Sequence, residues 1–264
     1  MIELKNISYA YPGQPPLLQN ISTTFADGKI TSILGPNGCG KSTLLKIICR
    51  LLQPSEGTIL LHGKDIHTMK TKTYAKEVTL LAQTNHPPEI TVEDLVAYGR
   101  YPHQKYGQGL TKEDKEIIAQ SIAQVKANEY AQRYVNRLSG GQRQRAYIAM
   151  ALAQNTDIIF LDEPTTYLDI NIRFEIMDLI RSLNQQGKTI IMVLHDLNLA
   201  LEYSDHIILM NSGQIVNQGS PLQIIHSGDI DRIFDITTHV FYENEKQFYH
   251  FANILAYNKN VHAD

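Results

Sequence analysis

One glycine-rich segment has the residue types and spacing needed to bind an anion. It follows the apolar stretch Ile30–Leu34, precedes the helix-compatible stretch Leu44–Leu52, and fits the pattern G-x-x-x-x-G-K-[ST]. Glycines let the backbone curl around an anion, so that amide N–H groups and the positive end of the following helix face its phosphates. The residues of this loop expected to contact a nucleotide are Gly35, Asn37, Gly38, Cys39, Gly40, Lys41, Ser42 and Thr43.

Two neighbouring carboxylates, Asp162 and Glu163, could complete the chemistry of such a site. They follow the apolar stretch Ile158–Leu161, which is typical of a buried strand. Adjacent strand residues point to opposite sides, so the two acids are expected to do different work. Asp162 and Ser42 are predicted to hold Mg²⁺, Glu163 to polarise an attacking water as general base, and Lys41 to reach the β- and γ-phosphates.

A second anion-binding pattern is Leu-Ser-Gly-Gly-Gln, followed by the helical stretch Arg143–Gln154. Its serine can cap the helix, and its two glycines expose backbone N–H groups toward a phosphate. This pentapeptide is the signature of the ABC ATPases, and between a phosphate loop and an Asp-Glu strand end it makes the chain resemble that family. The resemblance implies that two chains pair head to tail, each signature closing over the other's ATP. The signature residues concerned are Ser139, Gly140, Gly141 and Gln142.

Four further residues match elements of the same family in order along the chain. Tyr11 resembles the aromatic residue that stacks on adenine. Gln83 resembles the glutamine that touches Mg²⁺ and reports the γ-phosphate to a helical subdomain. Asp169 resembles the aspartate of the loop that crosses the dimer interface, although Tyr167 replaces a small residue there. His195 resembles the histidine that contacts the γ-phosphate and positions the water.

The elements that must position these residues alternate between strand and helix. The N-terminal stretch to about Phe25 is β-rich, with a turn at Pro12-Gly13. Stretches that are apolar on both faces suit the strands of a covered, largely parallel sheet. The predicted fold is α/β: a P-loop NTPase core with an N-terminal antiparallel β subdomain. The predicted core strands are Ile30–Leu34, Val78–Ala82, Ile158–Leu161, Thr189–Leu194 and His206–Met210.

A helical subdomain is expected to be inserted into this core over residues 91–155, with capping-box starts at Thr91 and Thr111. Ser220-Pro221 is expected to open a later helix. The ABC ATPase domain is predicted to span residues 1–235. The remaining residues, 236–264, form a tail whose aromatic part, Val240–Phe251, is predicted to be a small hairpin.

Composition limits where the protein works. With 264 residues, 43% of them hydrophobic, the chain can bury a substantial core. A net charge of -3 gives no electrostatic footprint for nucleic acid or anionic lipid. The start lacks an apolar signal region, and the longest apolar stretches are too short to span a bilayer. Cys39 and Cys49 lack the spacing of metal ligands, and a disulfide at Cys39 would obstruct the glycine-rich loop. Free cysteines of this kind fit a reducing cytosol. Membrane association is therefore expected to run through a protein partner.

Three kinds of ABC ATPase are compatible with the motifs. A DNA-repair or chromosome-organising relative would carry long heptad arms between phosphate loop and signature, where this chain has no sustained heptads. A translation factor would need two cassettes and basic surfaces for RNA. The transporter subunit is favoured, with ATP and Mg²⁺ as ligands, a second copy and a separate permease as partners, and the cytoplasmic face of the membrane as location.

The cargo is predicted from resemblance alone. The segments Tyr98–His103, Glu163–Ile170, Leu194–Leu199 and Tyr203–His206 look like those of import ATPases for iron–siderophore complexes, ferric citrate, haem and vitamin B12. Within that group the Gly-Arg-Tyr-Pro-His run looks most like the iron–siderophore members, whose chelate would come from an extracytoplasmic binding protein. Vitamin B12 and haem remain the alternatives. The region Glu89–His103 is expected to dock a cytoplasmic helix of the permease.

Overall fold

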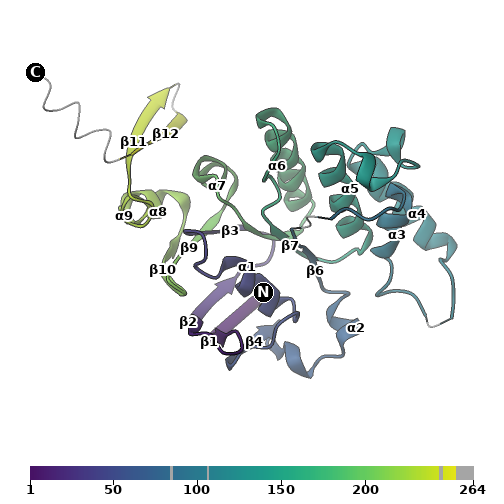
Figure 1. The fold of residues 1–264 in the computed structure, drawn as a ribbon, viewed down its shortest axis with the longest axis horizontal. Coiled ribbons are helices and arrows are strands. Elements are labelled where there is room, and N and C mark those ends of the chain that lie inside the picture. Colours follow the sequence, from purple (N-terminus) through teal and green to yellow (C-terminus); the bar gives the residue numbers. More distant parts are fainter. Residues whose placement is uncertain (84–85, 106, 244–245, 254–264) are drawn as a thin grey trace, which may run out of the picture.

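Two β-sheets with one helix between them form the middle of the molecule (Figure 1). The computed structural model describes residues 1–83, 86–105, 107–243 and 246–253. Its N-terminal antiparallel sheet has the strand order β2-β1-β4-β5. These strands are β1 (Ile2–Ala10), β2 (Pro16–Phe25), β4 (Glu56–Leu61) and β5 (Lys64–Asp65).

The central sheet has the order β10-β9-β3-β8-β7-β6 in the part of the chain that the structure describes. Its strands run parallel except β10, which pairs antiparallel with β9. Every residue of β3, β7 and β8 is buried, as expected for strands covered on both faces. The strands are β3 (Ile30–Leu34), β6 (Val78–Leu81), β7 (Ile158–Asp162), β8 (Thr189–Val193), β9 (His206–Asn211) and β10 (Gln214–Gly219).

Helix α1 (Lys41–Ile48) packs between the two sheets (Figure 1). Its apolar residues share one core with Ile7 and Phe25 of the antiparallel sheet and with Phe160 and Val193 of the central sheet. Because parallel strands end at the same edge, the loops that follow β3, β6, β7 and β8 lie close together. The α/β architecture with a separate antiparallel sheet confirms the predicted fold class.

A group of helices separates β6 from β7 in the sequence and lies to one side of the central sheet (Figure 1). Thr111 and Asp114 form a full capping box at the start of α4. At the start of α3, Thr91 accepts a hydrogen bond from the Asp94 N–H and donates its own hydroxyl to the Asp94 carboxylate, so this cap is one-sided. The elements are α3 (Val92–Tyr98), α4 (Lys112–Gln124), η2 (Asn128–Tyr130), η3 (Val135–Arg137) and α5 (Gly140–Ala153).

Six further helical elements complete the fold of the described residues. Helix α8 begins with Ser220 as its cap and Pro221 in its first turn. No helix within the described residues is long and apolar enough to cross a membrane. The elements are η1 (Ile66–Thr68), α2 (Thr71–Tyr74), α6 (Ile170–Gln185), α7 (Leu197–Tyr203), α8 (Pro221–His226) and α9 (Asp229–Phe234).

The tail forms a two-stranded hairpin of β11 (Ile236–Glu243) and β12 (Lys246–Asn253), far from α3–α5 in Figure 1. It begins earlier than the Val240 start expected from the sequence. Thr238 fixes the base of the hairpin by donating its backbone N–H to Asp231 of α9, at 3.1 Å. Tyr249 and Phe251 of β12 pack against the main hydrophobic core. This packing explains why β11 and β12 remain paired as far back as the first residue of β11.

Candidate nucleotide-binding site

The phosphate loop runs from the end of β3 to the start of α1. A Cβ atom at Gly35 would lie 2.2 Å from the Met210 carbonyl oxygen, so only glycine fits there. Gly40 has φ 102° and precedes α1, whose first N–H groups therefore face the loop. The Lys41 Nζ donates hydrogen bonds to the Gly35 and Pro36 carbonyl oxygens, at 2.7 and 2.9 Å. The loop and its ammonium group thus form a compact positive cradle that suits polyphosphate.

Ser42 and Asp162 bring two oxygen ligands together beside this cradle. The Ser42 hydroxyl donates to Asp162 Oδ1 at 2.9 Å. Burial raises the pKa of Asp162, and the hydrogen bond from Ser42 opposes that shift. Within the described residues, no group of three histidines, cysteines or acids could hold a metal alone. A hydroxyl and a carboxylate fit Mg²⁺ when nucleotide phosphates complete its shell, because Mg²⁺ binds to few protein oxygens.

Glu163 does not continue the strand, contrary to the expectation that strand alternation separates the two acids. β7 ends at Asp162, and Glu163 adopts the left-handed conformation with φ 56°. Its N–H donates to the Val193 carbonyl oxygen of β8 at 3.2 Å, which ties this turn to the neighbouring strand end. The two carboxylates are therefore separated by a change in backbone conformation, which costs free energy in a residue other than glycine.

The Glu163 carboxylate lies at the meeting point of three strand ends. His195 Nε2, after β8, donates to Glu163 Oε1 at 2.5 Å. Gln83 Nε2, after β6, donates to Oε2 at 3.3 Å, and the Thr166 hydroxyl donates to the same oxygen at 3.0 Å. The three predicted catalytic residues, Glu163, Gln83 and His195, thus lie in contact, whereas Thr166 was not predicted. A hydroxyl three residues after an acid, in a Pro-Thr-Thr turn, was the available signal.

Tyr11 lies next to the phosphate loop through its hydroxyl, which is 3.2 Å from Thr43 Oγ1. Its ring packs edge-on against Tyr9, with ring centroids 5.0 Å apart. Tyr11 is half-buried. Tyr11, which was predicted to stack on adenine, thus contacts the phosphate loop through its hydroxyl group.

The signature begins α5 in the way its residues predict. Ser139 and Gln142 form a capping box, with both side-chain to backbone hydrogen bonds at 3.3 Å. A Cβ atom at Gly141 would lie 2.7 Å from a side-chain methyl group of Ile172 in α6, so a larger residue would have to displace the Ile172 side chain. Asp169 occupies the N-cap position of α6. Ser139, Gly140, Gly141, Gln142 and Asp169 line one cavity of about 430 Å³.

The phosphate loop and the signature of one chain do not meet. Gly140 shares a small cavity of about 80 Å³ with Gln83, Asp162 and Glu163. Among the described residues that line this cavity and the larger one beside Ser139, none belongs to the loop over residues 35–43. The structure therefore groups Lys41, Ser42, Asp162, Glu163, Gln83 and His195 at one place, with Gly140 bordering it, while the cavity that the whole signature lines contains no residue of the phosphate loop.

Comparison with known proteins decides the family. The model of the family described as ABC transporter matches residues 18–166, more than half of the chain. The chain belongs to the ABC transporter family. It is an ATP-binding subunit of that family and an ATPase.

Curated relatives cover nearly the whole chain. The petrobactin import ATP-binding protein FpuC of Bacillus anthracis is 42% identical over 94% of this chain and 92% of its own length. The iron(3+)-hydroxamate import ATP-binding protein FhuC of Bacillus subtilis is 43% identical over 86% of each. One relative is therefore named for petrobactin import and the other for iron(3+)-hydroxamate import.

Solved structures share the fold. A putative metal-chelate type ABC transporter in an inward-facing conformation matches 95% of this chain and 96% of its own, with a TM-score of 0.82 and 26% identity. A dimeric bacterial ABC transporter cassette matches 84% of this chain and 99% of its own, with a TM-score of 0.74 and 32% identity. The fold is thus that of ABC cassettes.

Proposed function

We propose that this ATPase energises the import of ferric iron–siderophore complexes through a separate membrane permease. The observation that carries the proposal is the convergence of Gln83, Glu163 and His195 beside the Ser42–Asp162 pair. It occurs in a chain whose relatives are named for petrobactin and iron(3+)-hydroxamate import. The site supports ATP hydrolysis, and the relatives' names support the cargo.

In the proposed reaction, Lys41 and the N-terminus of α1 bind the β- and γ-phosphates of ATP. Glu163 accepts a proton from a water molecule whose oxygen attacks the γ-phosphorus, and the bond to the bridging oxygen breaks to release ADP and phosphate. His195 and Gln83 hold the Glu163 carboxylate and orient that water. Mg²⁺, held by Ser42, Asp162 and the phosphates, would neutralise charge that develops on the oxygens.

A second copy of the chain is the proposed partner that completes the site. The signature faces a cavity separate from the phosphate loop, so each chain offers two half-sites for one nucleotide. Head-to-tail pairing joins the loop of one copy to Ser139–Gln142 of the other. ATP binding then stabilises the closed dimer, because the nucleotide contacts both copies only in that state.

The permease is proposed to dock beside α2 and the segment after α3, at the cytoplasmic face of the membrane. A groove of about 660 Å³ lies there, lined by Thr71, Lys72, Tyr101, Pro102 and Lys105 among others. Tyr101 is well exposed and supplies apolar surface, while the two lysines favour a partner helix with acidic or carbonyl groups. Asp94, within the region first predicted to dock the permease, accepts the Thr91 hydroxyl with its carboxylate at 2.6 Å, at the start of α3.

The test of cargo is uptake by cells that depend on this subunit. Cells carrying Lys41→Ala should lose uptake of radiolabelled ferric siderophore delivered by the external binding protein, and keep uptake of labelled vitamin B12. Loss of vitamin B12 uptake with unchanged iron uptake across several siderophores would reverse the cargo assignment. Tyr101→Asp provides a separate test of docking, since it should abolish transport and release the permease while the purified subunit keeps its ATPase activity.

A further inference from the structure

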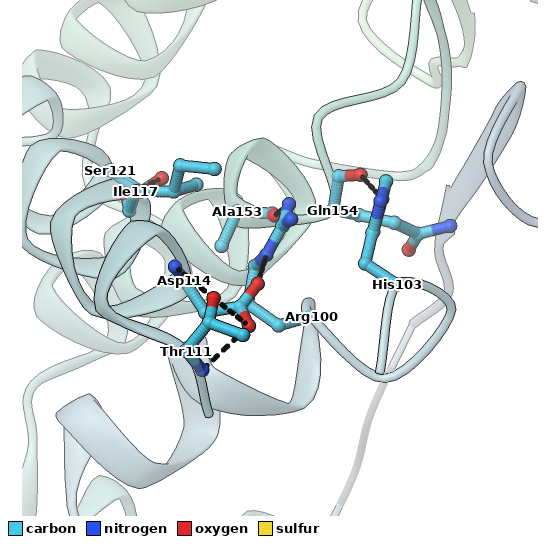
Figure 2. A network of polar contacts seen from close by, with 8 residues as sticks. All are labelled: Arg100, His103, Thr111, Asp114, Ile117, Ser121, Ala153 and Gln154. Atoms are coloured by element: carbon cyan, nitrogen blue, oxygen red, sulfur yellow. Dashed lines mark hydrogen bonds and ion pairs between the residues drawn. The ribbon is translucent and has the colours of Figure 1, made fainter. Parts of the chain in front are cut away.

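The segment Gly99–His103 lies against the last turn of α5, the helix whose first turn carries the signature (Figure 2). A Cβ atom at Gly99 would lie 2.3 Å from the Met150 carbonyl oxygen, so the two backbones touch. Building on the proposed head-to-tail dimer, we propose that Arg100 and His103 are positioning residues. They hold α5 by its C-terminal end and so set where Ser139–Gln142 meets the ATP of the other copy.

Arg100 is the main anchor. Its side chain is 5% exposed, and its Nε donates to Asp114 Oδ1 at 2.8 Å, while its Nη1 donates to the Ala153 carbonyl oxygen at 2.7 Å. Asp114 is fixed in turn by Thr111, whose N–H and hydroxyl both donate to Asp114 Oδ2 (Figure 2). One guanidinium therefore links α4 to the end of α5.

The contact with α5 is electrostatically favourable. The last carbonyl groups of a helix lack partners within the helix and carry partial negative charge. The last turn of α5, which lies wholly within the described range 107–243, has no basic residue of its own. Arg100 supplies that positive charge from outside the helix, and His103 Nε2 lies 2.8 Å from the next carbonyl oxygen, that of Gln154.

Gln154 connects the same helix end to the nucleotide side. Its Nε2 donates to the carbonyl oxygens of Ala75 and Val78, at 2.7 and 3.0 Å. Val78 begins β6, the strand that leads to Gln83. The C-terminal end of α5 is thus held by the segment Gly99–His103, which is itself tied to Asp114 of α4, and by the start of β6.

The anchored residues and the signature lie at opposite ends of the same helix, so the anchor at the C-terminal end of α5 affects the position of the signature. α5 is one continuous helix of 14 residues, about 21 Å long, so a tilt at one end displaces the other end. A small displacement of the Ala153 end therefore moves Gly140 and Gly141, whose N–H groups must lie within hydrogen-bond distance of a phosphate. The anchor affects dimer closure but not the binding of ATP to the phosphate loop of the same chain.

The experiment uses the full chain carrying Glu163→Gln, so that ATP is not consumed. We expect Arg100→Lys and His103→Ala each to raise the ATP concentration that gives half dimer by about tenfold, because each removes or weakens a polar contact that holds the C-terminal end of α5. His103→Gln should leave the ATP concentration that gives half dimer at the value of the parent chain, because a side-chain amide at this position can donate to the Gln154 carbonyl. Binding of a fluorescent ATP analogue to the monomer should not change.

Ser121→Ala is the matched control. Ser121 lies in α4 near this cluster, but its hydroxyl donates only to the Ile117 carbonyl of its own helix (Figure 2). The control should dimerise like the parent, even if its unfolding temperature falls. If Arg100→Lys and His103→Ala both dimerise like the parent, the inference about these two residues is wrong, while the proposed dimer stands. A Glu163→Gln parent that stays monomeric at every ATP concentration would overturn the proposed dimer and this inference with it.

Discussion

Glu163 is held by side chains from three separate strand ends, which is an arrangement suited to a base that must face one water molecule. Gln83, Thr166 and His195 all donate to its carboxylate. Glu163→Gln should lower ATP turnover on the order of 10²-fold or more, because the amide cannot accept the proton. ATP binding should persist, since Lys41 and the loop are unchanged. Steady-state phosphate release and equilibrium ATP binding measure the two effects.

Asp157→Asn is the matched control for that substitution. Asp157 precedes the same strand at its other end, and its side chain, which is 86% exposed, forms an ion pair with Lys188. Such pairs contribute little to stability, so turnover should stay at the wild-type value. Near wild-type turnover of Glu163→Gln would instead refute the role of general base.

At the residue scale, the sequence identified chemistry more readily than geometry. Glu163 was predicted from its place after an apolar strand, and resemblance to the ABC ATPases added Gln83 and His195 to the predicted catalytic residues. The left-handed backbone of Glu163 could not be predicted, because it depends on a hydrogen bond to Val193, which is distant in sequence. Arg100 was noticed only as part of a resembling motif, since burial beside α5 is a tertiary property.

Among the elements, the phosphate loop makes the sharpest demand on one side chain. Gly35→Ala should destabilise the fold by about 1–3 kcal/mol, because the new methyl group would overlap the Met210 carbonyl and displace the loop. ATP affinity should fall as well, since the Gly35 carbonyl holds Lys41. Chemical denaturation and nucleotide titration measure both losses.

Gly109→Ala is the comparison for that loop. A methyl group added at Gly109 would have no atom within 4 Å, and Gly109 has no left-handed φ, so its stability change should stay within about 0.5 kcal/mol. Equal effects of the two substitutions would show that close packing is not what requires glycine at position 35.

The helix pair α3–α4 should respond to acid through Asp114. Burial raises the pKa of Asp114, but hydrogen bonds from Arg100 and Thr111, with the charge of Arg100, outweigh burial and lower the pKa to about 2 from 3.8. A lowered folded-state pKa means that ionised Asp114 stabilises the fold above the unfolded-state value. That stabilisation is lost as the pH falls from 3.8 through about 2.

Urea unfolding of the wild type and of Asp114→Asn at several pH values tests this. The difference in unfolding free energy should be largest above the unfolded-state pKa and should shrink toward pH of about 2. A difference that stays constant across this range would mean that the charge of Asp114 does not contribute.

Element identity was largely predictable, and element pairing was not. Continuous apolar stretches predicted the bounds of β3. They predicted the bounds of the other core strands to within about one residue. The order β10-β9-β3-β8-β7-β6 depends on contacts between distant segments, which periodicity does not encode. The early start of β11 likewise depends on Thr238 meeting Asp231 of α9.

At the scale of the whole molecule, an exposed apolar strip lies beside the site. Tyr167 is 89% exposed and Ile170 is 67% exposed, at the turn before α6 and its first residue. Tyr167 also lines both the cavity of Glu163 and the cavity of the signature. Exposed apolar groups at such a place indicate a surface that another chain covers. The proposed dimer would bury this strip when ATP binds.

Tyr167→Asp in the Glu163→Gln chain should therefore abolish ATP-dependent dimerisation by burying a charge at the interface. The fold should survive, because Tyr167 has φ 62°, a conformation that aspartate tolerates well. Size-exclusion chromatography with and without ATP is the measurement. Tyr242→Asp is the control, since Tyr242 is 74% exposed but belongs to the tail hairpin. If both variants dimerise equally, the strip at Tyr167 is not the surface that joins the two copies.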